Sequence, residues 1–399
     1  MGYGDCDMTA TEIDPESSAS LDAGSAALLG LLRRDGPLTR AEMTAATGWA
    51  RVTVTSRLER LLDSGLLVAD EPVNGQRGRP AVRYRLNAAR AVLLVADIGA
   101  SGMRLARVDL DGRVEATEAV RAEIGDGPDD VLKKAREALV SLAGASGDRP
   151  VWGLAVSLPG PVDFAAGRVV TPPIMIGWDG VPVRDILKGW FRCPVLVEND
   201  ANAMALGEQA SRPATSDLLA VKVGTGLGCG IISGGRVMRG DAGAAGDIGH
   251  TWADVGQSAS EPPDCRCGKR GCVEAYVGGW AIARDVSATL GRDVDVDGVV
   301  ELLRAGDATT VRLVRDAGRV LGASLATAVS LLNPSTVVLS GQVAVAAGDH
   351  LLAGLRERIY TRALPLATRH LDISISTLWP DSGIHGLARG IADVVLTEH

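Results

Sequence analysis

Three cysteines within eight positions are the residues of this chain best suited to hold a metal ion. Cys265, Cys267 and Cys272 lie in a loop with two glycines, which can bring their thiolates to one point. His250, fifteen positions upstream, can supply a fourth ligand. Three thiolates and one imidazole suit Zn²⁺, and a site closed by four protein ligands is structural rather than catalytic. The alternative is a set of reduced core cysteines, which rarely cluster in this way.

A strand that runs directly into a helix places two further polar residues at a sheet edge. Asn199 and Asp200 follow the apolar residues 195–197 and precede an alanine-rich segment. The carboxyl ends of strands in open α/β sheets are where ligands bind, so Asn199 and Asp200 are candidate ligand contacts. The alternative for Asp200 is to cap the helix that follows.

Two glycine-containing turns have the form of phosphate-binding turns. Asp97 ends a buried strand, residues 99–102 form a small-residue turn, and a second strand follows. The same strand–turn–strand pattern recurs at residues 221–232. Such turns can present backbone N–H groups to phosphates, and the aspartate can hold a metal, although many hairpins look the same. Their recurrence suggests a duplicated α/β fold with a nucleotide-sized cleft between its halves.

Composition narrows the class of protein. The 399 residues exceed one ordinary core, and 46% hydrophobic with 23% charged residues is typical of a soluble globular protein. No apolar run reaches the length of a membrane span, so we expect no membrane partner. Residues 1–20 are acidic, lack the regions of a signal peptide and are expected to form a disordered tail. The remaining cysteines are scattered, as expected for a cytoplasmic protein.

The segment before residue 65 has the helix order of a helix-turn-helix. Apolar spacing predicts helices over residues 23–34, 40–46 and 50–64. Thr39 and Glu42 have the spacing of a capping box, and Gly48 provides the turn before the third helix.

The third helix has an apolar face and a polar face. The face expected to be buried contains Val54, Leu58, Leu61 and Leu62. The residues expected to enter or flank a DNA major groove are Arg51, Val52, Thr53, Ser56 and Arg57. Arg51 could read guanine, and Val52 could contact a thymine methyl group.

Two short strands, at residues 66–68 and 82–86, predict a wing after the third helix. The turn between them carries Arg77 and Arg79, a cationic tip suited to a narrow minor groove. Residues 31–90 hold eleven arginines and a net charge of +5, whereas the whole chain is at −8. We therefore expect a winged helix-turn-helix domain for operator DNA over residues 21–88. The alternative is a small domain for protein contacts.

The motifs together resemble one family. They are Asp97-x-Gly-x-Ser101, Pro159-Gly160-Pro161, Glu198-Asn199-Asp200-Ala201-Asn202, Gly246 to His250 and the cysteine loop, in that order over about 300 residues. With the winged helix before them, they resemble the repressor/open-reading-frame/kinase (ROK) family, and in particular its sugar-responsive regulators, relatives of bacterial glucokinases.

The resemblance implies a two-lobed actin/hexokinase-like (ribonuclease H-like) domain over residues 89–399. Lobe I would comprise residues 89–212 and a C-terminal helix at about 383–397, and lobe II residues 213–382. The sugar contacts implied are Gly160, Asn199, Asp200, Asp247, His250 and Glu274. The contacts implied for ATP and Mg²⁺ are Asp97, Gly99, Ser101, Gly224, Thr225 and Gly226. In kinases of the family, the aspartate matching Asp200 is the catalytic base.

Several departures from the kinase pattern affect the nucleotide site more than the sugar site. Residues 100–102 lack the lysine of the kinase turn, Asp247 replaces a glutamate, residues 340–342 replace a glycine-rich run, and Ile174 replaces an asparagine. We therefore expect a sugar-responsive repressor, a homodimer or dimer of dimers that binds a small carbohydrate. The alternatives are an ATP-dependent hexose kinase with an appended DNA-binding domain and a constitutive DNA-binding dimer.

Overall fold

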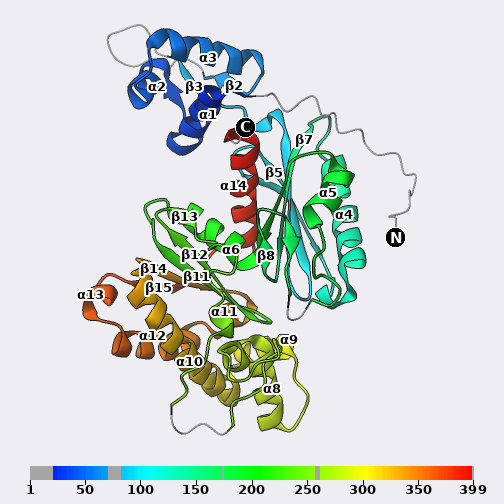
Figure 1. The fold of residues 1–399 in the computed structure, drawn as a ribbon, viewed down its shortest axis with the longest axis vertical. Coiled ribbons are helices and arrows are strands. Elements are labelled where there is room, and N and C mark those ends of the chain that lie inside the picture. The colour runs from blue at the N-terminus through cyan, green and yellow to red at the C-terminus, as the bar shows by residue number, and fades with distance from the viewer. Residues whose placement is uncertain (1–20, 71–81, 173–174, 257–260, 398–399) are drawn as a thin grey trace.

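The computed structural model describes residues 21–70, 82–172, 175–256 and 261–397. They form a small N-terminal unit and two larger α/β lobes stacked along the longest axis of the molecule (Figure 1). The predicted tail at residues 1–20, the wing tip with Arg77 and Arg79, and Ile174 lie outside the described residues. No described helix has the length and apolar character needed to cross a membrane.

The N-terminal unit has the predicted winged-helix order. Its elements are α1 (Ala23–Asp35), β1 (Leu38–Thr39), α2 (Arg40–Thr47), α3 (Arg51–Asp63), β2 (Leu67–Ala69) and β3 (Arg83–Leu86). The capping box of α2 is present, since Thr39 Oγ1 accepts from the Glu42 N–H at 3.2 Å and Glu42 Oε2 accepts from the Thr39 N–H at 2.7 Å. Gly48 ends α2 in the left-handed conformation. The short strand β1, which pairs with β3, was not predicted because two residues carry no periodicity.

Lobe I contains a five-stranded sheet in the order β10-β7-β4-β5-β6. Its strands are β4 (Val92–Ile98), β5 (Met103–Asp109), β6 (Val114–Val120), β7 (Val151–Leu158) and β10 (Val195–Asn199). The small hairpin of β8 (Val162–Asp163) and β9 (Arg168–Val169) precedes α5 (Val183–Phe191), and α4 (Pro128–Gly144) follows β6. The fully buried Trp178 lies in a core formed with residues of α4, α5 and the lobe I strands.

Lobe II repeats this topology with the order β13-β12-β11-β14-β15. Its strands are β11 (Leu218–Val223), β12 (Leu227–Ser233), β13 (Arg236–Val237), β14 (Thr336–Ser340) and β15 (Asp372–Ile375). In each sheet the first three strands are antiparallel and the last two are added in parallel. The expectation of a duplicated α/β fold is therefore confirmed. The helices of this lobe are α7 (Glu274–Val277), α8 (Gly279–Leu290), α9 (Val296–Arg304), α10 (Ala308–Leu332), α11 (Gln342–Ala347), α12 (Asp349–Arg362) and α13 (Pro365–Thr368).

Two helices, α6 (Asp200–Ala210) and α14 (Ser382–Thr397), join these parts. Helix α6 packs on α14 and on strands β11 and β12 of lobe II. Helix α14 lies along the lobe I sheet (Figure 1) and contacts α1 of the N-terminal unit. One hydrophobic core therefore runs through the N-terminal unit, α14 and the lobe I sheet. At this contact Arg33 of α1 pairs with Asp393 of α14 at 2.6 Å.

The contact between α6 and α14 depends on glycine. A Cβ atom on Gly207 of α6 would overlap the backbone carbonyl oxygen of Ser382, and one on Gly386 of α14 would overlap that of Ala203. Because both obstacles are backbone atoms of a helix, no side-chain rotation can remove them.

We predict opposite effects for two glycine-to-alanine substitutions in helices. Gly207→Ala should lower the free energy of unfolding by about 1–3 kcal/mol, because α6 and α14 must separate. Gly189→Ala in α5, where a Cβ would meet nothing within 4 Å, should raise it by about 0.5–1 kcal/mol through helix propensity. Urea denaturation of both variants measures the difference. Equal effects would contradict the proposed role of the α6–α14 contact.

Candidate functional site

A cavity of about 350 Å³ lies between the lobes and is lined by residues of both. All the residues for which the sequence predicted a sugar contact line it: Gly160, Asn199, Asp200, Asp247, His250 and Glu274. So do Gly99, Ser101, Gly224, Thr225 and Gly226 from the two predicted phosphate-type turns. The structure thus brings together segments that are far apart in the sequence, while their roles in binding stay predictions.

Asn199 caps α6 and fixes the position of Asp200. Its Oδ1 accepts from the N–H groups of Ala201 at 2.9 Å and Asn202 at 3.2 Å. Its Nδ2 donates to the Gly160 carbonyl oxygen at 3.0 Å, which ties the helix start to the 159–161 turn. Capping was the alternative role for Asp200, and it belongs to Asn199 instead. Asp200 is the first residue of α6 and lines the cavity.

Asp200 has a partner that the sequence analysis missed. Lys222 Nζ lies 2.6 Å from Asp200 Oδ2, with 22% and 10% of the two side chains exposed. Burial disfavours the charged lysine, but the Asp200 and Asp97 carboxylates outweigh it and raise the Lys222 pKa. Lys222 is therefore a cation at neutral pH. The sequence feature that could have indicated this partner is a lysine between two valines in an otherwise apolar strand.

Asp97 lies at the end of the central strand of lobe I, and Ser157 Oγ donates to its Oδ1 at 2.6 Å. Burial raises the pKa of the Asp97 carboxyl, and the positive charge of Lys222 opposes this shift. The 100–102 turn carries no basic side chain, as expected. Lys222 nevertheless brings a cation to the cavity from the other lobe.

Glu274 is held in place before any ligand binds. Its Oε2 accepts from the Leu227 N–H at 3.0 Å, and its Oε1 accepts from Trp280 Nε1 at 3.3 Å. The residue is 8% exposed and opens the short helix α7. Trp280 is thus a second residue that the sequence analysis missed, and it fixes the direction of this carboxylate.

The cysteine loop and His250 form a cluster that could hold a metal ion. The ligand atoms of His250, Cys265, Cys267 and Cys272 all lie within 4.8 Å of one another. Cys267 Sγ is 3.7 Å from Cys272 Sγ, and His250 Nδ1 is 3.8 Å from Cys265 Sγ. Two thiolates on one tetrahedral zinc ion would be about 3.8 Å apart, given a Zn–S bond of about 2.3 Å. The donor set and its spacing therefore fit such an ion.

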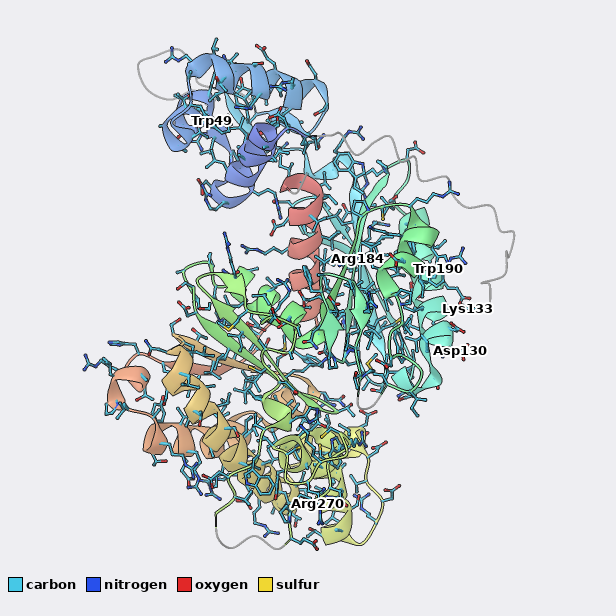
Figure 2. All side chains as sticks on the ribbon, viewed as in Figure 1. Trp49, Asp130, Lys133, Arg184, Trp190 and Arg270 are labelled. Atoms are coloured by element: carbon cyan, nitrogen blue, oxygen red, sulfur yellow. The ribbon has the colours of Figure 1, made fainter. Side chains whose placement is uncertain are left out.

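The cluster and the cavity share one side chain. His250 turns Nδ1 toward Cys265 and also lines the cavity, so its Nε2 is left for a cavity ligand. Glu274 follows the last cysteine by two residues. An ion in the cluster would therefore fix two cavity-lining residues at once. Figure 2 labels Arg270 of the cysteine loop, which lies in lobe II, away from the N-terminal unit.

Acidic groups outnumber basic ones around the cavity. Asp200 and Lys222 neutralise each other, which leaves the carboxylates of Asp247 and Glu274 among its lining residues. Asp247 is exposed and precedes His250 by three positions. The resulting negative potential disfavours anionic ligands and favours groups that donate hydrogen bonds.

The outward face of α3 is largely as predicted. Val52 is 78% exposed, Arg51 and Ser56 are also exposed, and Thr53 is half-buried. Arg57 differs, because its Nε lies 3.3 Å from Asp22 Oδ1 and its guanidinium stacks on Trp49 at 4.5 Å from the ring centroid. Arg57 therefore supports α3 from within the domain, and its contact with DNA stays a prediction.

Comparisons with known proteins agree with this architecture. The chain is 26% identical to a putative xylose repressor from Caldicellulosiruptor sp. (strain Rt8B.4) over 358 residues, which covers 86% of this chain and 88% of the relative. It is 32% identical to a glucokinase from Halalkalibacterium halodurans over 250 residues, covering 59% of this chain and 74% of that enzyme.

Solved structures match at the level of the fold. A ROK family transcriptional regulator, a homologue of the E. coli MLC protein, superposes with a TM-score of 0.80 at 23% identity, covering 96% of this chain and 98% of that one. A ROK family glucokinase from Streptomyces griseus, in complex with glucose and AMPPNP, gives a TM-score of 0.64 at 27% identity, covering 75% of this chain and 99% of that one. The model of the ROK family matches residues 94–393. This chain therefore belongs to the ROK family.

Proposed function

We propose that this protein is a sugar-responsive transcriptional repressor of the cytoplasm. Residues 21–88 would bind operator DNA, and residues 89–399 would bind a small carbohydrate between the lobes. The observation that carries the proposal is the joining, in one chain, of a winged helix with an exposed α3 face to a cavity lined with fixed polar groups. Two dimer-related winged helices would read a palindromic operator, which makes a homodimer or a dimer of dimers the expected assembly.

The cavity suits a neutral sugar. A sugar presents hydroxyl donors that match the carboxylates of Asp247 and Glu274, and its weaker acceptors can meet His250 Nε2. A phosphorylated sugar would bring negative charge to a cavity that already holds more acidic than basic groups. The glucose in the Streptomyces griseus enzyme supports this ligand class.

We propose that the His250 and cysteine cluster holds structural zinc. Four protein ligands leave no open coordination position, so the ion would supply rigidity and no reaction. Because His250 belongs to the cluster and Glu274 follows Cys272 by two positions, the ion would shape the cavity wall.

Operator binding is expected to depend on Arg51. Arg51→Ala should weaken binding about tenfold, because an exposed arginine at the start of α3 would lose its base or phosphate contact. Arg34→Ala, which removes an exposed arginine from α1, is the matched control and should have little effect. The operator is first selected from random double-stranded DNA, and affinities are measured by fluorescence anisotropy. Equal effects of both variants would argue against α3 as the reading helix.

Sugar binding is expected to depend on Glu274. A thermal-shift screen of unmodified hexoses, pentoses and their phosphates should give a neutral sugar that stabilises the protein and changes its operator affinity. Glu274→Gln should weaken binding of that sugar about tenfold or more, because a charge-assisted hydrogen bond is lost. Glu301→Gln, on the exposed side of α9, is the matched control and should bind normally. No shift with any sugar would refute the sensor function and leave a constitutive DNA-binding dimer.

Metal content is expected to depend on Cys267. The purified protein should contain about one zinc ion per chain by mass spectrometry, and Cys267→Ser should lose it because one of four ligands is gone. Its sugar affinity should fall as Glu274 and His250 lose their support. Cys193→Ala, at a buried cysteine outside the cluster, should keep the ion. Full zinc content in Cys267→Ser would remove this residue from the ligand set.

The second candidate function is an ATP-dependent hexose kinase. Asp200 opens α6 beside both glycine-containing turns, and the Halalkalibacterium halodurans relative is a glucokinase. A coupled ADP-release assay over common hexoses, with Asp200→Ala as the control, distinguishes it. Turnover that Asp200→Ala abolishes would establish the kinase in place of the repressor that only binds its sugar.

A further inference from the structure

Lys222 projects toward Asp200 because of its place in β11. Its neighbours Val221 and Val223 are fully buried on the opposite face of the sheet, among the lobe II helices. Leu218 and Ala220, on the same face of the strand as Lys222, pack against α6. Because side chains alternate along a strand, Lys222 lies on the same face as Leu218 and Ala220 and meets Asp200, the first residue of α6. The Asp200–Lys222 pair is therefore built into two regular elements and does not depend on a loop.

Lys222 also acts on a second carboxylate. Asp97 comes from the central strand of lobe I, and its charge and that of Lys222 influence each other's pKa in opposite directions. One ammonium group from lobe II thus pairs with Asp200 and acts electrostatically on Asp97. Arg104, the other cation that influences Asp97, is paired with Asp381 at 2.6 Å.

A Mg²⁺–nucleotide complex does not fit this arrangement. Asp97 is the carboxylate that the family resemblance assigns to the metal, and a divalent cation beside it would meet the positive charge of Lys222. A catalytic base needs a free carboxylate to accept the proton of a hydroxyl group, but Asp200 Oδ2 is already paired with the Lys222 ammonium group at 2.6 Å. A single side chain thus opposes both requirements of phosphoryl transfer.

We propose that Lys222, paired with Asp200, is an internal counter-ion that takes the place of a divalent cation at this edge of the lobe I sheet, so that this cavity binds its ligand without metal or nucleotide. It is the residue that determines receptor rather than kinase behaviour in this chain. The inference deepens the proposed function and rests on the observed ion pair.

The test is divalent-cation binding by the full-length, zinc-loaded protein, with Mn²⁺ as the probe. Lys222→Met keeps the length of the side chain and removes its charge, so it should bind Mn²⁺ about tenfold or more tightly than the parent protein, measured by electron paramagnetic resonance of free Mn²⁺. Lys222→Arg keeps the charge and should show no gain. The double variant with Lys222→Met and Asp97→Asn should lose the gain, which separates this site from the cysteine cluster.

Equal Mn²⁺ affinity of the parent protein and a folded Lys222→Met variant would overturn the proposal. If circular dichroism shows that Lys222→Met does not fold, the proposal is tested on the parent protein instead. Its sugar affinity should be the same with and without millimolar Mg²⁺ and ATP, and an increase with either would overturn the proposal. The Mn²⁺ assay uses neither DNA nor sugar, so its outcome is independent of whether the protein proves to be a repressor.

Discussion

The close packing of α6 against its neighbours is the constraint on which the rest of the structure depends. Gly207 and Gly386 let α6 and α14 approach until their backbones touch, and Gly230 of β12 lets α6 lie directly on the lobe II sheet. A helix clamped on both sides has little freedom to slide or rotate. Its first residue, Asp200, is therefore held at one point of the cavity, within reach of Lys222 on the neighbouring strand.

A charge pair in this position adds little net stability. Two groups that are only 10% and 22% exposed lose much of their hydration, and their mutual attraction offsets that loss without a large surplus. Removing one partner is costly, however, because the other is left as a buried, uncompensated charge. Glu274 also has partners within the protein, since the Leu227 N–H and Trp280 hold its carboxylate before a ligand arrives. The cavity is thus organised in advance, which lowers the entropy cost of binding.

Local patterns allowed prediction of the fold and of the lining residues, but not of the contacts between them. Thr39, Glu42 and Gly48 act within a few residues of one another, so their roles could be predicted from spacing. The cysteine loop was equally local. The pairing of Lys222 with Asp200 joins two lobes, and that of Arg57 with Asp22 joins α3 to the start of α1. Both depend on packing geometry that spacing along the chain does not contain, and β1 was too short to show a period.

The continuity of the core between the winged helix and lobe I limits how a ligand can act on DNA binding. Leu28 and Leu32 of α1 share one core with α14 and the lobe I sheet, and Arg33 adds an ion pair at its edge. Helix α14 begins next to Asp97, since a Cβ on Gly383 would overlap that carboxylate, and it ends against α1. The winged helix and lobe I therefore share one continuous core, whereas the cavity lies between lobe I and lobe II. Closure around a sugar would change the angle between them, and in a dimer its effect on an operator would arise from how lobe II places the two winged helices relative to each other.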